Sequence, residues 1–81
     1  MITVHIKLFA LGRELIGTGE LDWNCPEGTT VETLLKQLKN EYPRFAELTS
    51  FLTAVNMEYV EPNTALKDGD EVAIIPPVSG G

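Results

Sequence analysis

The sequence has very little of the chemistry that catalytic and metal sites commonly use. Its 81 residues include one cysteine, Cys25, and one histidine, His5. A single cysteine excludes an intramolecular disulfide and a metal site built from several cysteines. Because Cys25 shares a predicted strand face with Trp23, we expect a structural thiol rather than a nucleophile. His5 lies on the polar side of a predicted strand without an orienting partner in the pattern, and we expect a surface residue.

Positive charge is also scarce. Lysine and arginine number 6 against 12 aspartates and glutamates, which gives a formal net charge of −6. Nucleic acids and anionic membranes bind basic surfaces, so neither is an expected partner. The charge favours a basic protein partner instead.

Long apolar runs are missing as well. No segment approaches the length of a membrane span. The chain also does not start with a basic region followed by a long apolar segment, so we expect no signal peptide and a cytoplasmic protein. No spacing matches zinc, calcium or a phosphate-binding glycine loop, and no metal site is predicted.

Alternating apolar residues predict two antiparallel strands near the start of the chain. Every second residue from 2 to 8 is apolar, and Phe9 falls on the polar side. That position suits either the edge of a second small core or a contact surface. A second strand is predicted over residues 20–25. The glycine-rich residues 10–19 between them predict a loop with at most one helical turn.

A helix is predicted after residue 28. Thr29 as N-cap and Glu32 at the third helical position match a capping box. Pro43 ends the helix. The apolar stripe at helical spacing comprises Val31, Leu34, Leu35 and Leu38, with Tyr42 as an extension, while Lys36, Gln37, Lys39 and Asn40 face water.

The remaining residues predict a connection, a strand-rich segment and a last strand. Phe45 and Leu48 are expected in the core. Residues 52–60 predict either a hairpin with a tight turn at Asn56 or, because Met57 suits such a turn poorly, one long strand. A turn over residues 67–70 precedes the last strand, residues 71–75.

This order predicts one α+β domain over residues 1–75, a mixed sheet that packs on one main helix. We expect the first and last strands side by side in its centre. Phe9 and Ile75 would then share the sheet face away from the helix, and the segment around Tyr59 would add to the same apolar patch.

The last six residues, Pro76-Pro77-Val78-Ser79-Gly80-Gly81, predict an extended tail. Proline cannot donate to a sheet ladder, so Pro76 and Pro77 end the strand and stiffen the exit. Glycine lacks a Cβ, so Gly80-Gly81 is slim and flexible enough to enter a narrow pocket of another protein. There the terminal carboxylate could attack the α-phosphate of ATP and form an acyl adenylate. An inert, frayed terminus is the alternative.

With these residues in view, the chain resembles the ubiquitin-like sulfur carriers, and most closely the small subunits of molybdopterin synthase. The similarity extends over nearly the whole chain, and Met57 stands where many relatives have the glycine of an Asn-Gly turn. The matching elements are Phe9-Ala10 with Arg13-Glu14-Leu15 and Gly17, Thr30-Val31, Ala54-Val55-Asn56, Leu66 with Asp68-Gly69-Asp70-Glu71-Val72, and the tail.

The resemblance implies a β-grasp fold and a sulfur-donating subunit that is not catalytic alone and binds no cofactor itself. It implies that an ATP-dependent adenylyltransferase activates the Gly81 carboxylate. Sulfur from a cysteine desulfurase or rhodanese-like protein then gives a thiocarboxylate. The tail enters the large synthase subunit, in a heterotetramer of two small and two large subunits, and supplies sulfur to cyclic pyranopterin monophosphate for the molybdopterin dithiolene. Phe9, Arg13, Tyr59 and Ile75 fall at the implied partner interface.

Two alternatives share the tail chemistry. The chain could carry sulfur for another pathway, such as thiamine, amino-acid or tungsten-cofactor synthesis. It could also be a protein modifier that is joined through Gly81 to lysines of target proteins. A plain binding module with an inert tail is a third, chemically different reading.

Overall fold

The structure is a computed structural model that describes residues 1–77. One five-stranded sheet has the strand order β2-β1-β5-β3-β4. The strands are β1 (Ile2–Leu8), β2 (Glu20–Cys25), β3 (Leu52–Val55), β4 (Glu58–Tyr59) and β5 (Glu71–Ile75), and the helices are α1 (Ala10–Ile16), α2 (Val31–Glu41) and the short 3₁₀ helix η1 (Pro43–Glu47).

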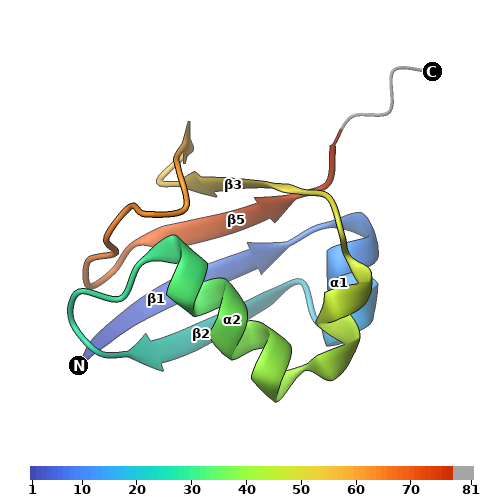
Figure 1. The fold of residues 1–81 in the computed structure, drawn as a ribbon, viewed down its shortest axis with the longest axis horizontal. Helices are drawn as coiled ribbons and strands as arrows, with labels where there is room; N and C mark the ends of the chain where they lie inside the picture. Colours follow the sequence, from blue (N-terminus) through green and yellow to red (C-terminus); the bar gives the residue numbers. More distant parts are fainter. Residues whose placement is uncertain (78–81) are drawn as a thin grey trace.

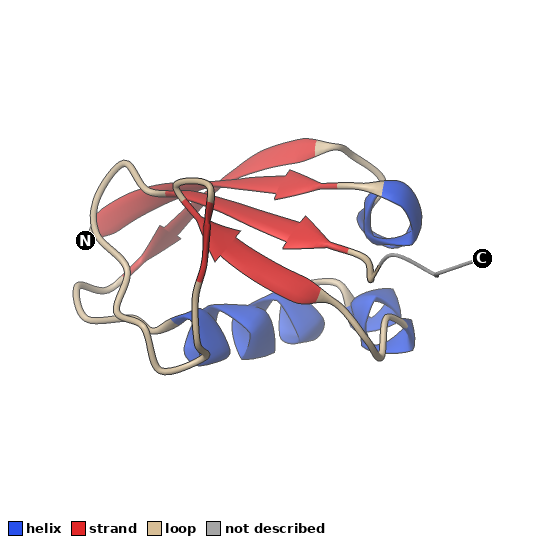
Figure 2. Cartoon of the chain, turned by 90° about the horizontal axis from the view of Figure 1, so that it is seen from above, coloured by secondary structure: helices blue, strands red, loops and turns tan. Residues whose placement is uncertain are grey.

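The first and last strands form the centre of the sheet, as predicted (Figure 1). β1 and β5 are parallel, and the other neighbouring strands are antiparallel. α2 lies across one face of the sheet, whereas no helix of the described residues covers the opposite face, called the open face below (Figure 2). The predicted mixed sheet packed on one main helix is therefore confirmed. Within residues 1–77, no helix is both long and apolar enough to cross a membrane.

The core lies between the sheet and α2. Phe45 in η1 is completely buried and Leu48 is 6% exposed, so both predicted core residues are confirmed. The predicted alternation of β1 is also confirmed. The other fully or nearly fully buried side chains are Val4, Ile6, Leu8, Cys25, Val31, Leu34, Leu38, Val72 and Ile74.

The start of α2 differs from the prediction by one residue. Thr30 is the N-cap, and its hydroxyl accepts a hydrogen bond from the backbone N–H of Thr33. Thr29 is buried, its hydroxyl donates to the Pro26 carbonyl, and its own carbonyl accepts from Leu66. The capping box of Thr29 and Glu32 was therefore wrong, because tertiary hydrogen bonds engage Thr29 before the helix begins.

One residue of the predicted solvent face of α2 is also partly covered. The Gln37 side chain accepts a 2.8 Å hydrogen bond from the Trp23 indole of β2. Buried indole N–H groups need such a partner, and the helix pattern alone does not reveal it.

The glycine-rich segment after β1 is a two-turn helix rather than a loop with one turn. Phe9 does not continue β1 but is the N-cap of α1, and Gly17 ends the helix with a left-handed φ of 96°. Gly12 lies so close to η1 that an added Cβ would be 3.5 Å from the Leu48 side chain. Burial of Leu15 and Ile16 stabilises the helix despite the low helix propensity of glycine.

The hairpin left open by the sequence is present. Asn56 and Met57 connect β3 to β4 with φ values of 52° and 71°, the backbone of a two-residue type I′ turn. The side-chain Nδ2 of Asn56 donates to Asp70 Oδ1 at 2.9 Å, and the side-chain Oδ1 of Asn56 accepts from the Glu71 N–H at 3.0 Å. These bonds hold the backbone of Asn56 in the left-handed conformation. Met57, the second turn residue, is also left-handed and is 85% exposed.

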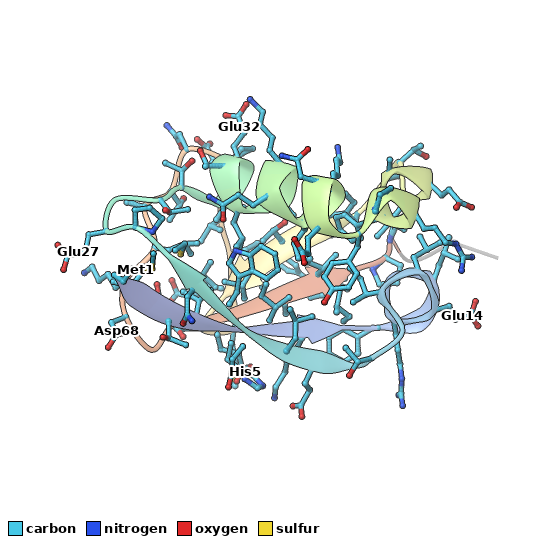
Figure 3. The ribbon with its side chains drawn as sticks, turned by 90° about the horizontal axis from the view of Figure 1, so that it is seen from below. Met1, His5, Glu14, Glu27, Glu32 and Asp68 are labelled. Carbon is cyan, nitrogen blue, oxygen red and sulfur yellow. The ribbon has the colours of Figure 1, made fainter. Side chains whose placement is uncertain are left out.

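His5 has two acidic neighbours that the sequence did not indicate. Its Nδ1 lies 2.7 Å from Asp22 Oδ1 and its Nε2 lies 3.4 Å from Glu20 Oε1, both on β2. The ring points away from α2, on the open face (Figure 3). The hydrogen bonds to Asp22 and then Glu20 raise the pKa of His5 above its usual 6.5.

We expect replacement of Met57 by glycine to stabilise the protein by roughly 0.5–1 kcal/mol. A left-handed conformation costs an L-residue about 1–2 kcal/mol, and glycine's larger unfolded-state entropy offsets part of the gain. The midpoint of urea unfolding measures the change. Asn56→Gly is the matched control and should destabilise, because it removes the bonds to Asp70 and Glu71. An unchanged or lower midpoint for Met57→Gly would contradict the inference that the left-handed backbone of Met57 is strained.

We expect the stability advantage of the wild type over His5→Gln to depend on pH. The folded-state pKa of His5 is raised, so the ion pairs contribute fully below the unfolded pKa of about 6.5 and are lost as pH rises through the higher folded value. Urea midpoints of both proteins should differ most near pH 5.5, where the carboxylates are still ionised, and converge in alkaline solution. In an Asp22→Asn background the pH dependence should shrink. A difference independent of pH would exclude this explanation.

Candidate functional site

The tail leaves the domain from the centre of the sheet. β5 ends at Ile75, Pro76 is partly buried and Pro77 is exposed. Neither proline can donate to a sheet ladder, so the strand ends where the sequence predicts. The predicted tail residues Val78, Ser79, Gly80 and Gly81 lie outside the described residues.

An apolar surface lies on the open face next to this exit. Leu52 pairs with Ile75, and Ala54 pairs with both Ala73 and Tyr59. Paired residues of neighbouring strands point to the same face, and Val72 and Ile74 take the core side. We call this surface the exit patch: Leu52, Tyr59, Ala73 and Ile75, together with Ala54, which is only 4% exposed between them.

Two members of the exit patch are unusually exposed for apolar side chains. Tyr59 is 70% exposed and Leu52 is 49% exposed. The structure thus brings the predicted residues Tyr59 and Ile75 together. Leu52 was missed by the sequence analysis, although the alternation of residues 52–55 would have placed it with Ala54 on one strand face.

Phe9 and Arg13 belong to a neighbouring groove rather than to the strand row of the exit patch. The Arg13 side chain lies over Gly19, where an added Cβ would be 3.4 Å from Nε. Phe9 is 47% exposed at the start of α1. Together with Lys7 and Glu20 they line an open groove of about 550 Å³. Phe9 and Ile75 were predicted to share the face away from the helix. Phe9 directly follows β1 as the extended N-cap of α1, so it lies outside the strand pairing that holds Ile75.

The rest of the open face is charged. Lys7 Nζ lies 3.5 Å from Glu71 Oε2, and His5 lies between Asp22 and Glu20. Register places His5 and Glu71 opposite each other on the paired strands β1 and β5. The open face therefore has a charged part on β1 and β2 and an apolar part at β3, β4 and the end of β5.

The described chain offers little for acid–base or nucleophilic catalysis. Cys25 is 1% exposed and its thiol is enclosed by the core. Among residues 1–77, no group of three His, Cys, Asp or Glu side chains is placed to hold a metal ion. What the geometry does supply is a rigid platform, with an exposed apolar surface beside the point where the chain end leaves the sheet.

Sequence comparison gives a relative that matches nearly end to end. The chain is 42% identical over 81 residues to a molybdopterin synthase sulfur carrier subunit from Chlamydomonas reinhardtii, and the match covers 96% of this chain and 98% of the relative.

Solved structures share the fold. A putative molybdopterin converting factor subunit 1 from Pyrococcus furiosus is 34% identical with a TM-score of 0.91, covering 96% of this chain and 100% of that one. The small archaeal modifier protein 1 of Methanosarcina acetivorans is 33% identical with a TM-score of 0.84, covering 100% and 98%.

A further structure contains a partner. It is a complex of subunits 1 and 2 of the molybdopterin-converting factor from Helicobacter pylori; its matching chain is 26% identical with a TM-score of 0.72, covering 99% of this chain and 100% of that one. These likenesses confirm the ubiquitin-like β-grasp fold.

The family match is equally extensive, since residues 6–81 match the ThiS family. That range includes both the exit patch and the glycine pair at the chain end. The chain therefore belongs to the ThiS family, and its predicted resemblance to the ubiquitin-like sulfur carriers is confirmed.

Proposed function

We propose that this protein is the sulfur-carrier small subunit of a molybdopterin synthase. The observation that carries the proposal is the 42% identity, over almost the full length of both chains, with a sulfur carrier subunit of that enzyme. The placement of the exit patch beside the start of the tail supports it, because a partner that binds the patch also receives the chain end.

In this proposal the reacting group is the carboxylate of Gly81. A carboxylate oxygen attacks the α-phosphorus of ATP in the active site of an adenylyltransferase, and pyrophosphate leaves. A persulfide sulfur on a cysteine desulfurase or a rhodanese-like protein then attacks the acyl carbon and displaces AMP. A cysteine thiolate of the sulfur donor or the adenylyltransferase cleaves the resulting acyl disulfide, which leaves a protein disulfide and the thiocarboxylate. The resulting thiocarboxylate supplies sulfur to cyclic pyranopterin monophosphate in the large subunit. The carrier itself binds no cofactor and is not catalytic alone.

Within this scheme the domain binds the large subunit and so positions the tail. Tyr59, Ile75 and Leu52 contact the large subunit, and Phe9 and Arg13 extend the contact through the neighbouring groove. Pro76 and Pro77 hold the exit extended, so Val78-Ser79-Gly80 carries Gly81 into the partner's pocket. The complex of subunits 1 and 2 from Helicobacter pylori supports a large-subunit partner of this kind. We propose the family heterotetramer of two small and two large subunits as the assembly.

A second role, as a protein modifier joined through Gly81 to lysines, is favoured by one observation. The modifier of Methanosarcina acetivorans has the same fold at 33% identity. Both roles begin with adenylation of Gly81, so they differ in the acceptor rather than in the carrier. Carrier roles in thiamine, amino-acid or tungsten-cofactor synthesis differ likewise in the acceptor, and copurification of the acceptor distinguishes them.

We expect Gly81 to gain sulfur when the protein is incubated with ATP, its adenylyltransferase and a sulfur donor. Intact-protein mass spectrometry should show one oxygen replaced by sulfur, located at Gly81 by fragmentation. One alanine added after Gly81 should abolish the conversion, because the reacting atoms move by one residue. A Gly81 deletion that still supports molybdopterin synthesis would disprove the carrier proposal. Covalent adducts that survive denaturant and thiol reductant would instead support the modifier role.

We expect Tyr59→Ala and Leu52→Ala to weaken binding of the large subunit by about tenfold each, the effect of removing a central apolar contact worth about 1–2 kcal/mol. Calorimetric titration measures the affinity. Unfolding midpoints should change little because both side chains are largely exposed. Lys39→Ala, on the exposed side of α2, is the control and should bind normally. Unchanged affinity for both Tyr59→Ala and Leu52→Ala would show that the exit patch is not part of the interface.

A further inference from the structure

β2 is an outer strand of the sheet, and one of its edges has no neighbour among residues 1–77. Of the described strands only β1 pairs with it, and it stands first in the strand order. Figure 3 views the molecule from this side, with β2 running across the front and α2 above the sheet. At the opposite edge, by contrast, the outermost strand β4 has only two residues. The longer uncovered edge of the sheet is therefore that of β2.

The hydrogen-bond register shows which backbone groups of β2 point outward. The N–H of Leu8 donates to the Gly19 carbonyl at 2.9 Å. In an antiparallel pair, bonded residues alternate with non-bonded ones. Leu21, Trp23 and Cys25 therefore bond to β1. The backbone groups of the alternate residues, Glu20, Asp22 and Asn24, point to the open edge.

Only Asp22 and Asn24 have unoccupied backbone groups at this edge of the described chain. The outward backbone groups of Glu20 are already hydrogen-bonded to Thr18, whose hydroxyl donates to the Glu20 carbonyl at 3.0 Å and accepts from the Glu20 N–H at 3.4 Å. Within residues 1–77, no residue hydrogen-bonds the outward backbone N–H or C=O of Asp22 or Asn24. Such a row of free donors and acceptors is a template for an added strand.

The side chains beside the edge differ between the two faces of the sheet. On the open face, the carboxylates of Glu20 and Asp22 are 61% and 73% exposed. On the helix side, Leu21 and Trp23 are only partly buried against the core. An added strand would therefore meet acidic groups on one of its faces and apolar groups on the other.

A second copy of the chain suits this edge poorly. Pairing two β2 edges brings the carboxylates of both copies onto one face, and like charges on facing strands are destabilising. The net charge of −6 adds to the repulsion. Opposite charges on facing strands attract each other and stabilise the pair. We propose that the β2 edge docks an extended segment of a partner protein in which Lys or Arg alternates with apolar residues.

This docking site is separate from the surface of the proposed function. β1 lies between β2 and β5, and the exit patch occupies β3, β4 and β5. The groove of Phe9 and Arg13 reaches Glu20 at the start of β2. A partner that holds the exit patch, the tail and this groove still leaves Asp22 and Asn24, the open part of the edge, free. The proposal goes beyond the sulfur-carrier role and stands or fails independently of it.

The test is titration of the full chain with a capped peptide of sequence Lys-Val-Lys-Val-Lys, compared with Glu-Val-Glu-Val-Glu. We expect the lysine peptide to slow hydrogen exchange of the Asp22 and Asn24 amides and to change the fluorescence of Trp23, the only tryptophan. The glutamate peptide should do neither. Unchanged exchange at both amides, or equal protection by the two peptides, would overturn the proposal. Protection confined to the exit patch, or a dimer of the chain that protects the same amides, would also overturn it.

Two variants separate the backbone and charge contributions. Asn24→Pro removes an outward N–H without removing a bond to β1 or a carboxylate, and we expect lysine-peptide binding about tenfold weaker, the net effect of one or two hydrogen bonds. Glu20→Lys with Asp22→Lys keeps the backbone and should reverse the preference to the glutamate peptide. Glu14→Lys with Glu32→Lys changes the net charge equally at other sites (Figure 3) and should retain lysine-peptide binding. An unreversed preference in the variant with Glu20→Lys and Asp22→Lys would contradict the proposal even if Asn24→Pro did not fold.

Discussion

The parallel pairing of the first and last strands is the constraint on which the rest of the structure depends. Turn residues next to β5 begin the contact: the His5 N–H donates to the Asp70 carbonyl, and the Gly69 N–H donates to the Thr3 carbonyl, each at 2.8 Å. Parallel strands cannot be joined by a tight turn. Residues 9–70 therefore form one long connection, and α2 packs on the face of the sheet that this connection crosses (Figure 1).

This pairing also decides where the chain end can be used. Val72 and Ile74 are completely buried between neighbours on both sides, so β5 is held firmly up to Ile75. The two prolines that follow cannot extend the ladder. The tail thus starts from one of the most constrained strands of the domain and beside an exposed apolar surface. This arrangement is suited to presenting a terminal carboxylate to another protein, since the carrier then needs no catalytic residues of its own.

The open face shows how one sheet can carry two surfaces. Its apolar part lies on β3, β4 and the end of β5, whereas its charged part lies on β1 and β2, where His5 is paired with Asp22 and Glu20. Because β1 separates β2 from the exit patch, a partner at the tail and a partner at Asp22 and Asn24 would not compete for the same residues. The acidic composition of the chain is consistent with basic partners at both.

The sequence by itself determined β1, the helix-facing core and the proline exit, because each follows from a local pattern: alternation in β1, helical spacing from Val31 to Leu38, and the fixed φ of Pro76. It did not determine α1, whose glycines are tolerated only because Leu15 and Ile16 are buried. It also did not determine the N-cap, because contacts from Leu66 engage Thr29. The Asn56 turn, the grouping of Leu52 with Tyr59, and the acidic partners of His5 were decided by the tertiary structure, since register between distant strands brings these residues together.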